Sequence, residues 1–182
     1  MTDLDGVGRD ERRPGRIVVG VSGSLGSLAA LHRAVAEARG TGAELLAVLA
    51  WTPPGGEHGY RLAPCPPLLA TWEETAAGRL REALDEAFGG APAGVRLCAQ
   101  VIRGDGGAAL VHTADRPGDL LVVGAGGGSL LRRGLRPSVT AHCVRHASCP
   151  VLAVPRPSLH RELEAFHRRN VWHLPTTPAP SR

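Results

Sequence analysis

Residues 122–155 read VVGAGGGSLLRRGLRPSVTAHCVRHASCPVLAVP, and they contain the pattern that decides the fold. The stretch begins inside an apolar run, residues 120–124, which predicts a buried strand. A loop rich in glycine and arginine follows, and then Pro137-Ser138-Val139-Thr140 opens a predicted helix near 138–146. Residues 151–154 predict a last strand. A strand, a glycine-rich loop, a helix and a strand in this order predict a parallel βαβ unit covered by helices.

The chain before this stretch shows the same alternation of strands and helices. Apolar runs or alternating residues predict strands over three segments: 16–21 (RIVVGV), 45–51 and 95–101. Helical spacing of apolar residues predicts helices near 28–39, 68–88 and 108–114, the first capped by Ser24 or Ser27. Residues 52–67 are expected to form a long loop of proline and glycine. Because crossovers between parallel strands are right-handed, the order predicts an α/β fold with an open five-stranded parallel sheet and helices on both faces.

Length and composition favour one domain with additional segments at its ends. The chain has 182 residues, of which 43% are hydrophobic, so it can bury a substantial core. Residues 1–15 are polar and lack periodicity, which predicts a flexible leader before a domain over 16–155. Residues 156–182 predict a short helix, carrying Leu159, Leu163 and Phe166, and a proline-rich tail.

The charged residues exclude several functions. All 21 cationic residues are arginine, and the absence of lysine excludes a P-loop NTPase and a lysine Schiff base. The net charge is +4, and part of the basic excess lies in one short loop, at Arg132, Arg133 and Arg136. Aromatic residues make up only 3%, which argues against a nucleic-acid surface. The basic loop therefore indicates a small anionic ligand or a solvated loop.

The cysteines and the apolar runs indicate in which cellular compartment the protein is expected. The four cysteines form no CxxC pair and suggest no disulfide framework. The N-terminus is not apolar, and the longest apolar run, 45–51, is far shorter than the roughly 20 residues that span a bilayer. We therefore expect a reduced, cytoplasmic protein that does not bind membranes.

The loop after the fourth predicted strand is the candidate binding site. Four glycines let the backbone approach a ligand closely. The following helix would offer free N–H groups and the positive end of its dipole to an anion. The glycines are Gly124, Gly126, Gly127 and Gly128. Composition alone leaves open whether this is a phosphate cradle or a flexible connection.

The order of these motifs resembles the universal stress protein family. Its nucleotide-binding members carry Gly-x-x-Gly, nine residues and Gly-Ser, and this chain has Gly124-x-x-Gly127, nine residues and then Pro137-Ser138. RIVVGVSGSLGSLAALHRAV (16–35) resembles the first strand and helix of the family, and GDLLVVGAGG (118–127) resembles its fourth strand. Cys-Pro-Val at 149–151 matches the start of its last strand. The resemblance covers 16–155.

This resemblance implies a Rossmann-like fold and a regulatory protein rather than an enzyme. It implies a homodimer formed through the last strand, Val151–Val154. It also implies ATP as the ligand, held mainly by backbone groups. The implied binding residues are Gly20, Val21, Ser22, Ala50, Gly124, Gly127, Ser138, Val139 and Thr140.

Two departures from the family pattern weaken the predicted ATP site. Pro137 replaces the glycine before the serine, and proline has no N–H to donate to a phosphate. Loss of one hydrogen bond to a charged group costs on the order of 1.5–3 kcal/mol. Ser22 replaces the acidic residue after the first strand, which leaves a shorter and neutral partner for a ribose or base.

The sequence leaves two other functions open and offers one weaker metal hypothesis. A nucleotide-free dimeric scaffold of the same fold is the first alternative. The second is an ATP pyrophosphatase-like enzyme, because SGSLGS (22–27) faintly resembles the SGGxDS loop, although Gly26 takes the place of its aspartate. His142 and His146 are spaced four apart as zinc ligands would be, but we expect Cys143 and Cys149 to be core residues and predict no metal.

Overall fold

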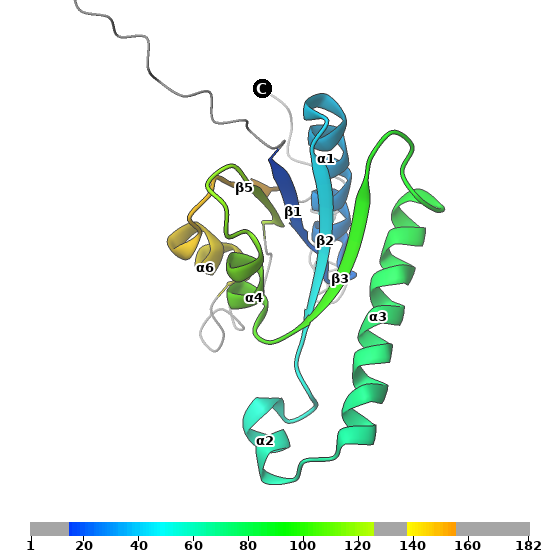
Figure 1. Cartoon of the computed structure of the whole chain (residues 1–182), viewed down its shortest axis with the longest axis vertical. Coiled ribbons are helices and arrows are strands. Elements are labelled where there is room, and N and C mark those ends of the chain that lie inside the picture. The colour runs from blue at the N-terminus through cyan, green and yellow to red at the C-terminus, as the bar shows by residue number, and fades with distance from the viewer. Residues whose placement is uncertain (1–14, 126–137, 156–182) are drawn as a thin grey trace, which may run out of the picture.

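The computed structural model describes residues 15–125 and 138–155, and within them five parallel strands form one sheet in the order β3-β2-β1-β4-β5 (Figure 1). This confirms the predicted Rossmann-like α/β fold. The strands are β1 (Arg16–Gly20), β2 (Glu44–Trp51), β3 (Leu97–Arg103), β4 (Leu120–Gly124) and β5 (Val151–Val154). The helices are α1 (Leu25–Thr41), α2 (Gly56–Leu62), α3 (Pro66–Phe88), α4 (Gly106–Thr113) and α6 (Val139–His146).

Three predicted features lie outside the described residues. The first is the leader, apart from Gly15. The second is the loop rich in glycine and arginine, which includes Gly127, Pro137 and the three arginines. The third is the helix and tail after Pro155.

Helices cover both faces of the sheet, as the sequence predicts. Ile17 and Val19 of β1 lie in a core cluster with α1 and α3, whereas Val18 lies in a second cluster with α4 and α6. Figure 1 shows α1 and α3 on one side of the sheet and α4 and α6 on the other. The side chains of alternate residues in a strand point to opposite faces of the sheet. Because helices cover both faces here, residues of both sets are apolar, and the strands show no alternation of apolar and polar residues.

The helix ends follow local chemistry. Ser24 is the N-cap of α1 and accepts a hydrogen bond from Ser27 N, which settles the choice between the two serines. Gly42 ends this helix in the left-handed conformation, at φ 70°. Pro66 begins α3, in the first turn where proline loses no helical hydrogen bond.

Two predictions about elements were wrong. The expected loop 52–67 contains α2, which buries none of its residues, so no apolar period against the core announces it. The third strand begins at Leu97 and reaches Arg103, whereas the prediction placed it over 95–101. Strand β3 extends to Arg103 because it pairs with β2 as far as Trp51. Val95 lies outside the strand, directly after a turn at Gly94.

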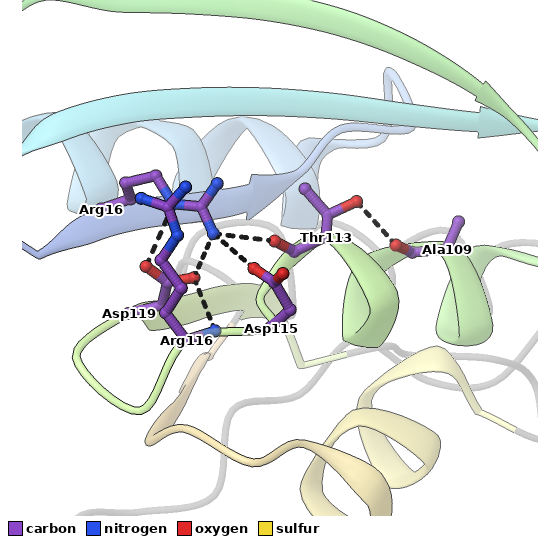
Figure 2. A network of polar contacts seen from close by, with 6 residues as sticks. All are labelled: Arg16, Ala109, Thr113, Asp115, Arg116 and Asp119. Atoms are coloured by element: carbon purple, nitrogen blue, oxygen red, sulfur yellow. Dashed lines mark hydrogen bonds and ion pairs between the residues drawn. The ribbon is translucent and has the colours of Figure 1, made fainter.

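A polar network joins β1 to the segment that precedes β4, at the amino end of the sheet (Figure 2). Arg16 forms ion pairs with Asp115 and with Asp119, whose side chain is only 1% exposed. Arg16 also donates to the carbonyl oxygen of Thr113, at the end of α4. The network therefore holds the amino ends of β1 and β4 together.

Candidate functional site

The predicted site lies at the carboxyl ends of β1 and β4. The chain crosses from β1 to β2 on one side and places β4 on the other side of β1. This is the switch point of the sheet, where ligands of open α/β folds bind. The loop after β1 leads into α1, and α6 begins after the loop that follows β4.

Three serines shape the turn between β1 and α1. Ser22 N donates to Ser27 Oγ at 3.2 Å, and Ser27 Oγ donates to Ser24 O at 2.8 Å. Ser22 Oγ lies 3.0 Å from Ser24 Oγ. Ser22 and Ser24 are exposed, whereas Ser27 is buried. The turn thus has a fixed backbone and presents two hydroxyl groups to solvent.

Gly124 lies against the first turn of α1. A Cβ atom at this position would be 2.5 Å from Gly26 O and 3.2 Å from Ser27 N. Both distances are shorter than a side chain tolerates without movement of its neighbours. At Gly124 the end of β4 therefore approaches the backbone at the start of α1 so closely that a side chain at this position has no room.

The start of α6 is tied to the same glycine. Thr140 Oγ1 donates to Gly124 O at 2.9 Å, and Ser138 is the N-cap of α6, accepting from Ala141 N at 3.5 Å. Ser138 and Val139 are exposed. Gly124 therefore contacts the starts of both α1 and α6, although they are far apart in the sequence.

No carboxylate offsets the dipoles of these two helices in their first turns, and each begins with a neutral serine cap. By contrast, α4 begins with Asp105, whose carboxylate accepts from Gly107 N and Ala108 N. Positive partial charges at the starts of α1 and α6 favour an anion beside Gly124.

The remaining predicted residues lie in β1 and β2 or directly after β1. Gly20 ends β1 and packs against α4, where a Cβ would come within 2.7 Å of Leu110 Cδ1. Val21 is buried and donates from its N–H to Val48 O at 2.8 Å. Ala50 is half-buried in β2, where it pairs with Ile102 of β3.

Gly26 and Ser27 belong to this junction but are not among the predicted binding residues. Both are buried, and they connect Ser22 to Gly124. The repeated serine spacing at 24 and 27 signals a helix cap, but only the folded sheet brings Gly124 against this turn.

The comparisons identify the family. A model described as the universal stress protein family matches residues 14–155. The chain belongs to this family. The search of curated proteins matched no relative of this universal stress protein.

Solved structures with the same fold include other universal stress proteins. One, described as a universal stress protein in complex with cAMP, is 31% identical; the match covers 77% of this chain and 95% of that chain, with a TM-score of 0.54. The universal stress protein UspA from Lactobacillus plantarum is 24% identical, covering 78% of this chain and 98% of that chain, with a TM-score of 0.57. The hypothetical protein MJ0577 is 19% identical, covering 80% and 98%, with a TM-score of 0.61. The last two show the fold alone.

The histidines and cysteines after β4 lie mostly in or beside the core. Cys143 and Cys149 are buried, as predicted, and burial raises the pKa of Cys143 to about 11. The rings of His142 and His146 lie 4.5 Å apart between centroids, and His142 packs on Gly107 of α4. Among the described residues, no three histidine, cysteine or acidic side chains gather as a metal site would need.

None of the helices in residues 15–125 and 138–155 combines the length and the apolar character that a membrane crossing requires.

Proposed function

We propose that this universal stress protein is a regulatory module, not an enzyme, that binds an adenine nucleotide at the carboxyl ends of β1 and β4. Backbone groups and serine hydroxyls would hold the phosphates, and the base would lie toward Ala50. The universal stress protein that is 31% identical was solved with cAMP, which supports a nucleotide as the ligand class.

The contact of Gly124 with both helix starts carries this proposal. It joins the N-termini of α1 and α6, neither of which has a carboxylate in its first turn. A phosphate beside Gly124 would meet two positive dipole ends and face no side chain from Gly124 itself. The exposed Ser22 and Ser138 hydroxyls lie at the two ends of this junction.

The first test asks whether nucleotide accompanies the protein. Protein purified without added nucleotide is denatured, and the supernatant is separated by chromatography and read by absorbance. A nucleotide in stoichiometric amount supports the proposal. If the supernatant is empty and titrations with ATP and with cAMP show no binding, the nucleotide-free scaffold is the function. Formation of ADP or AMP from ATP over hours would favour the enzyme alternative.

Two variants test the weakened parts of the site. Pro137→Gly would restore one N–H, and Ser22→Asp would add a carboxylate at an exposed position beside Ser24. We expect each to tighten ATP binding by about tenfold, the worth of one hydrogen bond to a charged partner. Calorimetric titrations without a gain in either variant would remove the phosphate-cradle interpretation.

We further propose a homodimer formed through β5. This strand is an edge of the sheet, because within 15–125 and 138–155 it pairs only with β4. Leu121 N donates to Pro150 O and Ala125 N donates to Val154 O, so these groups point inward. The backbone groups of Val151 and Ala153 therefore point outward, where the same strand of a second copy would pair.

The burial of the β5 side chains decides which variant can test this dimer. Leu152 and Val154 pack against the core cluster beside α1, so arginine there would disturb the fold as well as an interface. Ala153 is exposed and its N–H points outward, so Ala153→Pro removes one edge donor and leaves the pairing with β4 intact. We expect this variant to lose the β5 dimer in light scattering; an unchanged mass would contradict it.

A further inference from the structure

The opposite edge of the sheet offers a second surface for pairing. Strand β3 has β2 as its only partner within the described part of the chain, and its central residues Cys98, Ala99 and Gln100 are all exposed. Strand β5 has four residues flanked directly by Pro150 and Pro155, whereas β3 has seven residues and no proline directly before or after it. A long strand edge without proline is a template for another strand. We propose that the outer edge of β3 pairs antiparallel with β3 of a second copy.

Two hydrogen bonds show which backbone groups of β3 are available. Leu45 N donates to Arg96 O at 2.9 Å, and Gly104 N donates to Trp51 O at 2.8 Å. The backbone groups of these two even-numbered residues, Arg96 and Gly104, thus point toward β2. Since successive residues of a strand direct their N–H and C=O groups to alternate sides, the groups of Leu97, Ala99 and Val101 point outward.

The outward residues select a register. A two-fold axis normal to the sheet keeps each copy's α3 on the same face, and it then requires odd residues to oppose odd residues. If the axis passes beside Ala99, this residue opposes Ala99 of the second copy, and Leu97 opposes Val101 of the second copy. Apolar residues then meet on the face that α3 covers. In this register Arg96, just before β3, opposes Ile102, and Arg103 opposes Val95, so neither arginine opposes another arginine.

The side chains near the axis leave room for the second strand. Ala99 belongs to the α3 face by its pairing with Ala47, yet it is exposed, so α3 does not reach over the outer side of β3. Arg103 is directed to Glu57 through two hydrogen bonds of 2.8 and 2.7 Å and stacks over Tyr60, 4.7 Å from the ring centroid. The large cation at the end of β3 is therefore held by its own chain.

Two edges that both pair would produce assemblies larger than a dimer. Each pairing is symmetric, but β3 and β5 lie at opposite ends of one sheet, so the two together continue the sheet from copy to copy. We therefore expect the mass of the full chain to exceed a dimer as concentration rises.

Matched proline variants separate the two edges. Ala99→Pro removes an outward N–H of β3, and Ala153→Pro removes one of β5; neither disturbs the inner ladder. Light scattering should show species above a dimer for the wild type, a dimer for each variant and a monomer for the double variant. If Ala99→Pro has the mass profile of the wild type, the β3 edge does not pair. If Ala99→Pro alone gives monomers, the β3 edge pairs and the proposed β5 dimer is wrong.

Disulfide cross-linking of introduced cysteines tests the register of the β3 pairing independently of the proline variants. In a background with Cys65 and Cys98 changed to serine, Ala99→Cys places its thiol opposite its own copy, with Cα atoms about 5.5 Å apart. Gln100→Cys is the control, because its symmetry mate would lie beyond the roughly 7 Å that a disulfide spans. Mild oxidation should cross-link Ala99→Cys into dimers and leave Gln100→Cys monomeric on denaturing gels. Equal cross-linking of both variants, or of neither, would overturn the register.

Discussion

Arg16 and Asp119 meet in a two-pronged ion pair, with Nε to Oδ1 at 3.2 Å and Nη2 to Oδ2 at 2.7 Å (Figure 2). The Asp119 carboxylate is buried and also accepts from Arg116 N at 3.3 Å. Burial withholds water from this carboxylate, so its partners must replace the lost hydration. Arg16 is therefore the residue that makes a buried charge tolerable at the start of β4.

Asp119→Asn should lower the free energy of unfolding by about 3 kcal/mol, because it removes the charge that faces Arg16 in a buried pair. Urea unfolding followed by circular dichroism measures this change. Asp115→Asn is the matched control, since Asp115 contacts the same Nη2 atom at 2.7 Å but its side chain is 64% exposed. The control should change stability far less; equal losses would show that burial of Asp119 is not what matters.

Gly124→Ala should destabilise the fold by about 2 kcal/mol, because its Cβ would press on the Gly26 carbonyl and push α1 away from β4. Thermal and urea unfolding measure the effect. The control is Gly40→Ala in α1, where a Cβ meets no atom within 4 Å and where alanine should stabilise the helix by up to about 1 kcal/mol. A harmless Gly124→Ala would mean that the backbone contact is looser than described.

The four cysteines should divide into two fast and two slow thiols. Cys65 and Cys98 are exposed, whereas burial raises the pKa of Cys143 to about 11 and also raises the pKa of Cys149. Only the thiolate attacks a disulfide reagent. Ellman's reagent at pH 8 should therefore titrate two thiols quickly and the other two only after denaturation. Rapid reaction of all four would contradict the burial of Cys143 and Cys149.

The sequence predicted the central part of the fold because apolar runs and helix caps are local signals. Strand β4 has the predicted limits, and Ser24 caps α1 as one of the two serines expected. Helix α2 was missed because it buries nothing and begins at two glycines with positive φ, a composition typical of turns. It contacts the rest of the domain through Arg103 of β3, which pairs with Glu57, and through Trp72 of α3, which packs against Tyr60, and local sequence cannot show either contact.

The candidate site was predictable only in part. The glycine and serine motifs pointed to the ends of β1 and β4, where the sheet does bring Ser22, Gly124 and Thr140 close together. The connection through Gly26 and Ser27 depends on how α1 packs on β4. That contact joins residues almost a hundred positions apart, so no spacing rule along the chain could reveal it.

The most direct test of the proposed site is a calorimetric titration of ATP into the wild type and into Thr140→Val. Valine keeps the shape of threonine but removes the hydroxyl that ties α6 to Gly124 O, so the two helix starts would no longer be held together. Thr113→Val is the control, because Thr113 Oγ1 bonds within its own helix, to Ala109 O at 2.8 Å. We predict binding by the wild type, unchanged binding by Thr113→Val and weaker binding by Thr140→Val, by up to about tenfold, because ligand binding must then order a site that has lost one internal hydrogen bond. Equal affinity of Thr140→Val and the wild type, or no binding by the wild type, would contradict a nucleotide site between α1 and α6.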